Sequence, residues 1–231
     1  MIILFLFLIK IINNRLSFSF PIATTLNNGN IFIIHKTGIT ICDYSLTKII
    51  KYVTNFTTDD EQISTEEKLS KVSISKFNNG YIVSIIINKI YIFDKIGNFK
   101  RDKDLYFTID NLYYSLTAYK YDIDYYYFLI GFIYQQSLYL YYYKYDPASQ
   151  QINEAAKKLG FYETDEFDSP IYLQNKGISC QFLKYSNTED LILCLFSLYY
   201  DFLNELNFVT FYISGNSIIP KKLNLNIIVI V

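Results

Sequence analysis

Few residues of this chain have the chemistry that catalysis usually requires. The 231 residues include one histidine, His35, and three cysteines. Histidine is the most frequent general acid or base, and a Ser-His-Asp triad in this chain would depend on His35 alone. Its place in an alternating stretch, residues 31–41, predicts a strand histidine near a turn. We therefore predict no catalytic residue and no intrinsic enzyme activity.

Metal and nucleotide sites are not predicted either. A structural zinc site needs four ligands at short spacing, which one histidine and three dispersed cysteines do not supply. The acidic segment ETDEFD, residues 163–168, lacks the ligand spacing of a calcium loop and is interpreted as a solvated loop. Neither glycine-rich phosphate-binding pattern, GxxxxGK[ST] or GxGxxG, occurs. We expect no cofactor and no metal ion.

Three aspartates have a structural interpretation. Asp43, Asp94 and Asp146 each follow a predicted strand, where a carboxylate accepts hydrogen bonds from backbone N–H groups further along a turn. Two acids are nevertheless enough for a glycosidase, so a carbohydrate-active enzyme with a carboxylate pair is the alternative to a non-enzymatic function. Two carboxylates in a deep pocket would favour the enzyme, whereas a broad exposed aromatic patch would favour binding.

Two cysteines predict a disulfide. Cys180 and Cys194 lie in apolar segments on either side of a polar turn, residues 185–190. A hairpin folded about Asn187 places the two cysteines opposite one another on one face, because both are equally distant from that residue. The bond would close a loop of about 15 residues and stabilise the fold by roughly 3 kcal/mol. Cys42 is left alone and is interpreted as a small buried hydrophobic residue.

Composition excludes several classes of protein. A chain with 51% hydrophobic residues and few glycines and prolines is neither disordered nor collagen-like. The net charge is −1 and the lysines are scattered, so we expect no nucleic-acid partner. The 24 tyrosines and 19 phenylalanines accompany abundant Ile, Asn and Lys, a bias that follows A/T-rich codons. Tyrosine-rich stretches are therefore not interpreted as ligand platforms.

The N-terminus predicts a signal peptide, residues 1–19. The apolar run of residues 2–9 has the length of a signal-peptide hydrophobic region and is shorter than the roughly 20 residues of a membrane span. Ser17 and Ser19 are small residues suited to a cleavage after position 19. The alternative is a buried first strand, because no basic residue precedes the apolar run. We expect a secreted or cell-surface protein without a membrane span in its mature part, residues 20–231, and a glycan at Asn55 in the single N-x-S/T triplet.

An internal repeat organises the first half of the chain. LNNGNIFIIHKTGITICD, residues 26–43, and FNNGYIVSIIINKIYIFD, residues 77–94, superimpose without a gap at an offset of 51 residues. Each copy has an Asn-Asn-Gly turn, a strand, a tight turn, an alternating strand and an aspartate. This order predicts a β-meander. Looser third and fourth copies follow later in the chain.

The repeated meanders resemble those of β-propeller repeat proteins. Apolar runs at residues 81–87 and 125–133 suit strands that neighbouring blades cover on both faces. The resemblance implies an all-β fold with about four antiparallel blades in an open or incomplete array, and a binding scaffold. A β-sandwich is the alternative fold. The helical spacing of apolar residues in YYDFLNEL, residues 199–206, also allows a short helix between two strands.

Together these features predict a secreted or surface-exposed, non-enzymatic binding protein whose partner is an extracellular protein or glycan. The other alternative is an inactive fragment of a longer repeat protein. The terminal Ile-Ile-Val-Ile-Val, residues 227–231, looks like the first strand of a further unit. An uncharged strand of this kind at a sheet edge favours self-association.

Overall fold

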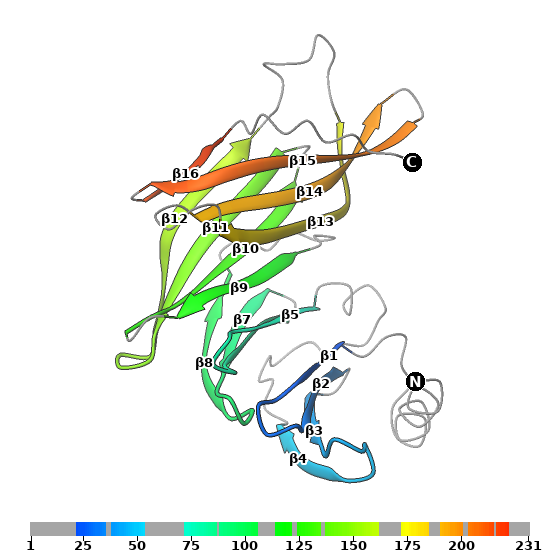
Figure 1. Cartoon of the computed structure of the whole chain (residues 1–231), viewed down its shortest axis with the longest axis vertical. Helices are drawn as coiled ribbons and strands as arrows, with labels where there is room; N and C mark the ends of the chain where they lie inside the picture. The colour runs from blue at the N-terminus through cyan, green and yellow to red at the C-terminus, as the bar shows by residue number, and fades with distance from the viewer. Residues whose placement is uncertain are drawn as a thin grey trace.

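The computed structural model describes residues 22–35, 38–53, 72–86, 88–105, 114–121, 124–134, 137–161, 172–184, 190–200, 203–214 and 216–221. Within these residues the chain forms sixteen β-strands and no helix, so the predicted all-β class is confirmed. Accordingly, none of the described segments is an apolar helix long enough to cross a membrane. The strands form two four-stranded sheets and one eight-stranded sheet (Figure 1).

The first two sheets are antiparallel meanders with their strands in chain order. The first contains β1 (Ile22–Thr25), β2 (Ile31–His35), β3 (Gly38–Cys42) and β4 (Ile49–Val53). The second contains β5 (Val72–Lys76), β6 (Ile82–Ile86), β7 (Lys89–Phe93) and β8 (Phe99–Asp104). The two similar sequence windows take the same local structure: Gly29 and Gly80 have φ angles of 85° and 96° in equivalent turns. Glycine adopts this left-handed conformation without the steric cost that a side chain brings.

The third sheet consists of two meanders joined into one curved sheet. Its strands are β9 (Ser115–Tyr121), β10 (Tyr126–Tyr134), β11 (Ser137–Asp146), β12 (Gln151–Phe161), β13 (Tyr172–Lys184), β14 (Asp190–Tyr200), β15 (Leu203–Ser214) and β16 (Ser217–Pro220). The short β16 pairs antiparallel with β15 and parallel with β12, where Lys157 lies opposite Ser217. The remaining edges, β9 and β13, come together through side-chain hydrogen bonds at Cys180, so the sheet is a nearly closed barrel.

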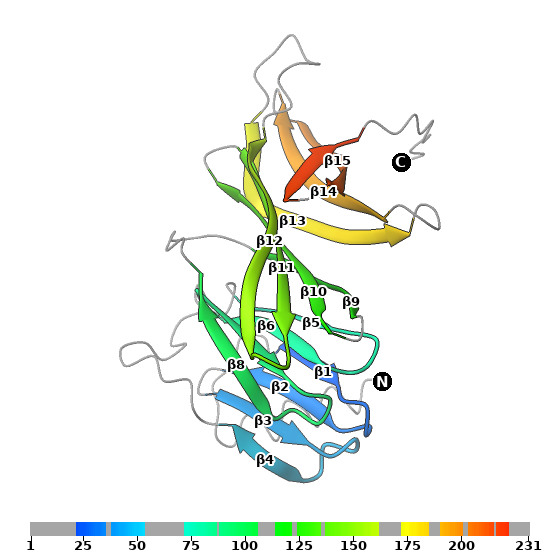
Figure 2. The same cartoon turned by 90° about the vertical axis from the view of Figure 1, so that its left-hand side faces the viewer.

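The side chains of each middle strand alternate between two cores. In β6, Ile82 and Ile86 pack toward the first sheet, whereas Val83 and Ile85 pack toward β9–β12. In β10, alternate residues likewise divide between the second sheet and the barrel interior. Both β6 and most of β10 are consequently buried on both faces, as their apolar sequences predicted. The sheets therefore stack in chain order, with the barrel at one end (Figures 1 and 2).

One local prediction is wrong. Residues 199–206 form no helix in their described part, because β14 ends at Tyr200 and β15 begins at Leu203. Tyr199 pairs with Asn204 and Leu198 with Glu205 in an antiparallel ladder that continues for ten residue pairs. The continuous backbone ladder of this long hairpin outweighs a short helical period in the sequence.

Other predictions concern residues outside the described part of the chain. These are the signal peptide at residues 1–19, the glycosylation site at Asn55, the acidic loop at residues 163–168 and the final strand at residues 227–231.

Candidate functional site on the outer face of the third sheet

A difference in strand length accompanies a part of the third sheet that is only partly covered. β6 and β7 have five residues each, whereas β10 has nine and β11 has ten. The second sheet covers the half of β10 and β11 that carries Phe128 and Tyr143, and β11 and β12 continue past it into the barrel (Figure 2). On the continuing part, Tyr134, Tyr139 and Tyr141 are only partly buried. These three tyrosines are called the tyrosine face below.

The rings of this region stand in a nearly parallel row. Phe132, which is 1% exposed, lies opposite Tyr139 in the ladder, with ring centroids 5.2 Å apart and planes inclined by 5°. The ring of Tyr141 is 5.9 Å from that of Phe132 and 6.2 Å from that of Tyr143. The ring of Tyr134 lies 6.3 Å from that of Tyr139 but is tilted by 54°, so Tyr134 stands beside the parallel row and not in it. Because buried rings and a continuous ladder hold them, the tyrosines have little freedom to reorient.

Charged groups border the row on the neighbouring strand β12. Lys157 lies opposite Tyr141 and Glu154 opposite Tyr143, and Lys157 Nζ is 3.2 Å from Glu154 Oε1. Burial raises the pKa of Tyr141, and the Glu154 carboxylate and Tyr139 raise it further, so the phenol stays neutral at physiological pH. The surface thus combines tyrosine rings and hydroxyls with a carboxylate and an ammonium group.

The three aspartates occupy the structural positions predicted for them. The Asp43 carboxylate accepts hydrogen bonds from the Ser45 hydroxyl at 2.6 Å and the Lys48 N–H at 2.9 Å, and these bonds lower its pKa to about 2. Asp94 and Asp146 accept backbone N–H groups in the same manner in their own turns. These carboxylates therefore stabilise turns.

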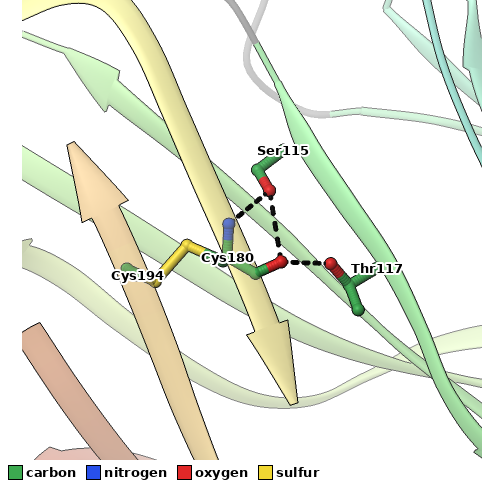
Figure 3. The surroundings of a disulfide bond; sticks show 4 residues. All are labelled: Ser115, Thr117, Cys180 and Cys194. Atoms are coloured by element: carbon green, nitrogen blue, oxygen red, sulfur yellow. Dashed lines mark hydrogen bonds between the residues drawn. A yellow bond between two sulfur atoms is a disulfide. The ribbon is translucent and has the colours of Figure 1, made fainter. Parts of the chain in front are cut away.

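The predicted disulfide is confirmed. Cys180 and Cys194 are directly opposite in the β13–β14 ladder, with an S–S distance of 2.10 Å, and both are essentially inaccessible. The Cys180 N–H donates to Ser115 Oγ at 2.7 Å, and its carbonyl accepts from the hydroxyls of Ser115 and Thr117 (Figure 3). A Cβ at Gly131 of β10 would lie 3.0 Å from Cys180 Sγ, so the glycine makes room for the bond. This buried bond supports the barrel and is not itself a binding surface.

The remaining candidate residues stay separate. His35 ends β2 opposite Gly38, the position of a strand residue beside a turn. Cys42 is a free cysteine and 2% exposed, as predicted, and burial raises the pKa of its thiol, with a further contribution from Asp43. In the described segments, no three His, Cys, Asp or Glu side chains come together where they could hold a metal ion.

The tyrosine face was missed by sequence reasoning because its tyrosines were attributed to codon bias. One signal was present: Tyr139, Tyr141 and Tyr143 alternate in β11 and therefore share a face. Alternation does not reveal which part of that face another sheet covers. The relative lengths of strands from two different units decide this.

Comparisons with known proteins give no family. No protein-family model and no curated protein matches the chain. A solved structure of a protein of unknown function from Bacteroides caccae is similar, with a TM-score of 0.39 and 10% sequence identity. The similarity covers 81% of this chain and 59% of that one, so this chain spans less than two thirds of that protein's length.

Proposed function

We propose that the chain is a secreted or surface-exposed, non-enzymatic binding protein that recognises an extracellular protein or glycan through the tyrosine face. The observation that carries this proposal is a row of nearly parallel rings beside Glu154 and Lys157, in which Tyr139 and Tyr141 are partly exposed. Tyrosine provides a large amphipathic contact area at a low cost in side-chain entropy, because it has only two rotatable side-chain torsions. Rings held in place provide a contact surface for a ligand, and the neighbouring polar groups can form hydrogen bonds with it.

The disulfide supports an extracellular location. Disulfides persist in secreted and surface proteins and are rare where cytosolic thiols keep cysteines reduced. Cys180 and Cys194 form such a bond within a barrel interior, where both are at most 1% exposed. Cleavage of a signal peptide after Ser19 would place the chain in that environment.

We also propose that the meanders form an open, propeller-like array. Support comes from contacts between the first strands of successive units. Ser73 of β5 donates to the carbonyl of Tyr114, the residue just before β9, and Ser75 accepts the Ala118 N–H of β9. Ser115 of β9 bonds in turn to the backbone of β13. First strands thus lie side by side along the array, an arrangement typical of blades around an axis.

Four carboxylates that the sequence or the tyrosine face singles out are engaged in other contacts, which favours binding over carbohydrate hydrolysis. Asp43, Asp94 and Asp146 are engaged in turns. Glu154, beside the tyrosine face, is paired with Lys157. A hydrolytic carboxylate pair needs one group held protonated and a second one facing it across the substrate, and these engaged carboxylates do not match that need.

Binding assays on arrays of glycans and of extracellular proteins test the proposal. The disulfide-bonded chain should bind a ligand on one array, and Tyr139→Ala should weaken that binding at least tenfold, because it removes a ring from the row. Tyr52→Ala is the matched control, since Tyr52 is 50% exposed in β4, on a different sheet. It should leave binding unchanged. Thermal unfolding of each variant verifies folding.

Two results would contradict the proposal. Equal binding by the wild type and Tyr139→Ala would show that the tyrosine face does not bind the ligand. Turnover of a glycan substrate that two acid substitutions abolish would show an enzyme instead. Expression in a eukaryotic secretory host, with N-terminal sequencing of the medium fraction, tests secretion separately; a chain retained in the cytosol with Met1 intact would refute it.

A further inference from the structure

The chain contains two Asn-Gly dipeptides, at equivalent positions of the internal repeat. Asn28-Gly29 lies in the turn between β1 and β2, and Asn79-Gly80 lies in the turn between β5 and β6. In both turns the glycine has a positive φ angle and donates its N–H to the carbonyl three residues earlier, at 3.1 Å in the first turn and 2.8 Å in the second. The two turns therefore share one local geometry, and a difference in their chemistry must come from their surroundings.

The second of these turns is held between neighbouring sheets. The Asn79 side chain donates from Nδ2 to the hydroxyl of Tyr126, in the third sheet, at 2.9 Å. The Asn79 carbonyl accepts Nδ2 of Asn27, in the turn of the first sheet, also at 2.9 Å. Gly80 is buried, and a Cβ added to it would lie 2.3 Å from the Asn27 side chain. Contacts from two other sheets thus fix both the side chain of Asn79 and the peptide group that follows it.

The first turn has no such contacts in the described part of the chain. Asn28 and Gly29 are exposed, and a Cβ added to Gly29 would meet no atom within 4 Å. Asn28 Oδ1 accepts the Asn30 N–H at 3.2 Å, just as Asn79 Oδ1 accepts the Tyr81 N–H at 3.3 Å. Among the described residues, however, nothing accepts a hydrogen bond from Asn28 Nδ2. Solvent therefore reaches both the side-chain amide and the backbone nitrogen that follows it.

We propose that Asn28 is a site of spontaneous deamidation in the folded protein, and that contacts from the neighbouring sheets protect Asn79. A base from the solvent removes the proton of the Gly29 backbone nitrogen, which attacks Cγ of Asn28 and closes a five-membered succinimide ring. The Cγ–Nδ2 bond breaks, and ammonia leaves after taking up a proton from the solvent. Water then adds to either carbonyl of the ring and opens it, which leaves aspartate or isoaspartate at this position. Glycine permits the attack because it has no side chain to crowd the ring.

The same reaction at Asn79 has a higher barrier. Its Nδ2 must leave the Tyr126 hydroxyl, its carbonyl must turn away from Asn27, and water must enter a partly buried turn. Breaking hydrogen bonds of this kind slows a reaction by about tenfold or more. Deamidation therefore adds a negative charge to the turn between β1 and β2, on a different sheet from the tyrosine face.

Peptide mapping by mass spectrometry tests the proposal on the full disulfide-bonded chain, incubated in mildly alkaline buffer at physiological temperature. Fragmentation that separates aspartate from isoaspartate identifies the products at each position. Asn28 should convert about ten times faster than Asn79 in the folded chain. In the reduced chain in denaturant the two rates should be equal, because each asparagine then has only its sequence neighbours, Asn before and Gly after.

Two variants test the protection of Asn79. Tyr126→Phe removes the hydroxyl that holds its side chain, and Asn27→Ala removes the contact with its carbonyl. Each should raise the rate at Asn79 by up to about tenfold, and Tyr126→Phe should leave the rate at Asn28 unchanged. Tyr52→Phe is the matched control, since Tyr52 lies in β4 and is 50% exposed, and it should change neither rate. Thermal unfolding verifies that each variant is folded.

Several outcomes would overturn the inference. One is a folded chain in which Asn28 stays intact while the unfolded chain converts, and another is equal conversion of Asn28 and Asn79 in the folded chain. A rate difference that persists in denaturant would place its cause in the sequence and not in the contacts between sheets. An unchanged rate at Asn79 in both Tyr126→Phe and Asn27→Ala would refute the protection. None of these measurements depends on ligand binding, so this inference and the proposed function stand or fall separately.

Discussion

Replacing Ser115 by alanine would test how the eight-stranded sheet is closed. Ser115 Oγ accepts the Cys180 N–H at 2.7 Å, across the gap between the two edge strands β9 and β13. Cys180 is 1% exposed and Ser115 is 9% exposed, so water does not readily replace the lost hydroxyl. The variant would therefore leave a buried N–H group without its acceptor.

The expected cost follows from that unsatisfied donor. A buried donor without a partner destabilises a fold by about 1–3 kcal/mol. We therefore expect Ser115→Ala to lower the free energy of unfolding by about 2 kcal/mol, which for a protein of this size lowers Tm by roughly 4–8 °C. Urea and thermal denaturation under non-reducing conditions measure both quantities. Circular dichroism and intrinsic tyrosine fluorescence are suitable probes.

Ser84→Ala is the matched control. Ser84 lies in β6, is fully buried, and its hydroxyl has no hydrogen-bond partner within the described residues. Removing a buried, unsatisfied hydroxyl should leave stability unchanged or raise it by up to about 1 kcal/mol. Equal destabilisation by Ser115→Ala and Ser84→Ala would refute the reasoning, because the loss would then reflect packing and not the closing hydrogen bond.

Two further substitutions probe other stabilising features. The double variant Cys180→Ala/Cys194→Ala should lose about 3 kcal/mol of stability in urea unfolding, because the bond spans a sequence separation of 14 residues; an unchanged midpoint would contradict this. Asp43 has a pKa lowered from 3.8 to about 2 in the fold, so its contribution to stability is present above pH 3.8 and is lost as the pH falls toward 2. In acid titrations followed by circular dichroism, Asp43→Asn should remove that part of the pH dependence. If the free energy of unfolding fell equally with pH in the wild type and in Asp43→Asn between pH 3.8 and pH 2, Asp43 would not contribute to the pH dependence of stability.

The sequence alone determined the features that depend on local order. Alternating apolar residues and Asn-Asn-Gly turns predicted the strands and the equivalence of the first two meanders. The Cys180–Cys194 pair was predictable because two strands joined by one turn place residues at equal distances from the turn opposite one another. Asp43 and Asp94 were interpreted correctly as turn acceptors for the same reason, since their hydrogen bonds reach only a few residues along the chain.

Only the tertiary structure decided how the units combine. The parallel contact between β12 and β16 joins two meanders into one sheet, and Ser115 meets Cys180 across 65 residues of sequence. Residues 199–206 show the same dependence, because the long β14–β15 ladder overrode their local helical spacing. The tyrosine face exists because β10 and β11 are longer than β6 and β7, which are strands of a different unit. Side-chain alternation is a local property that assigns residues to a face. Which faces remain uncovered depends on contacts between distant segments, and a sequence pattern does not contain those contacts.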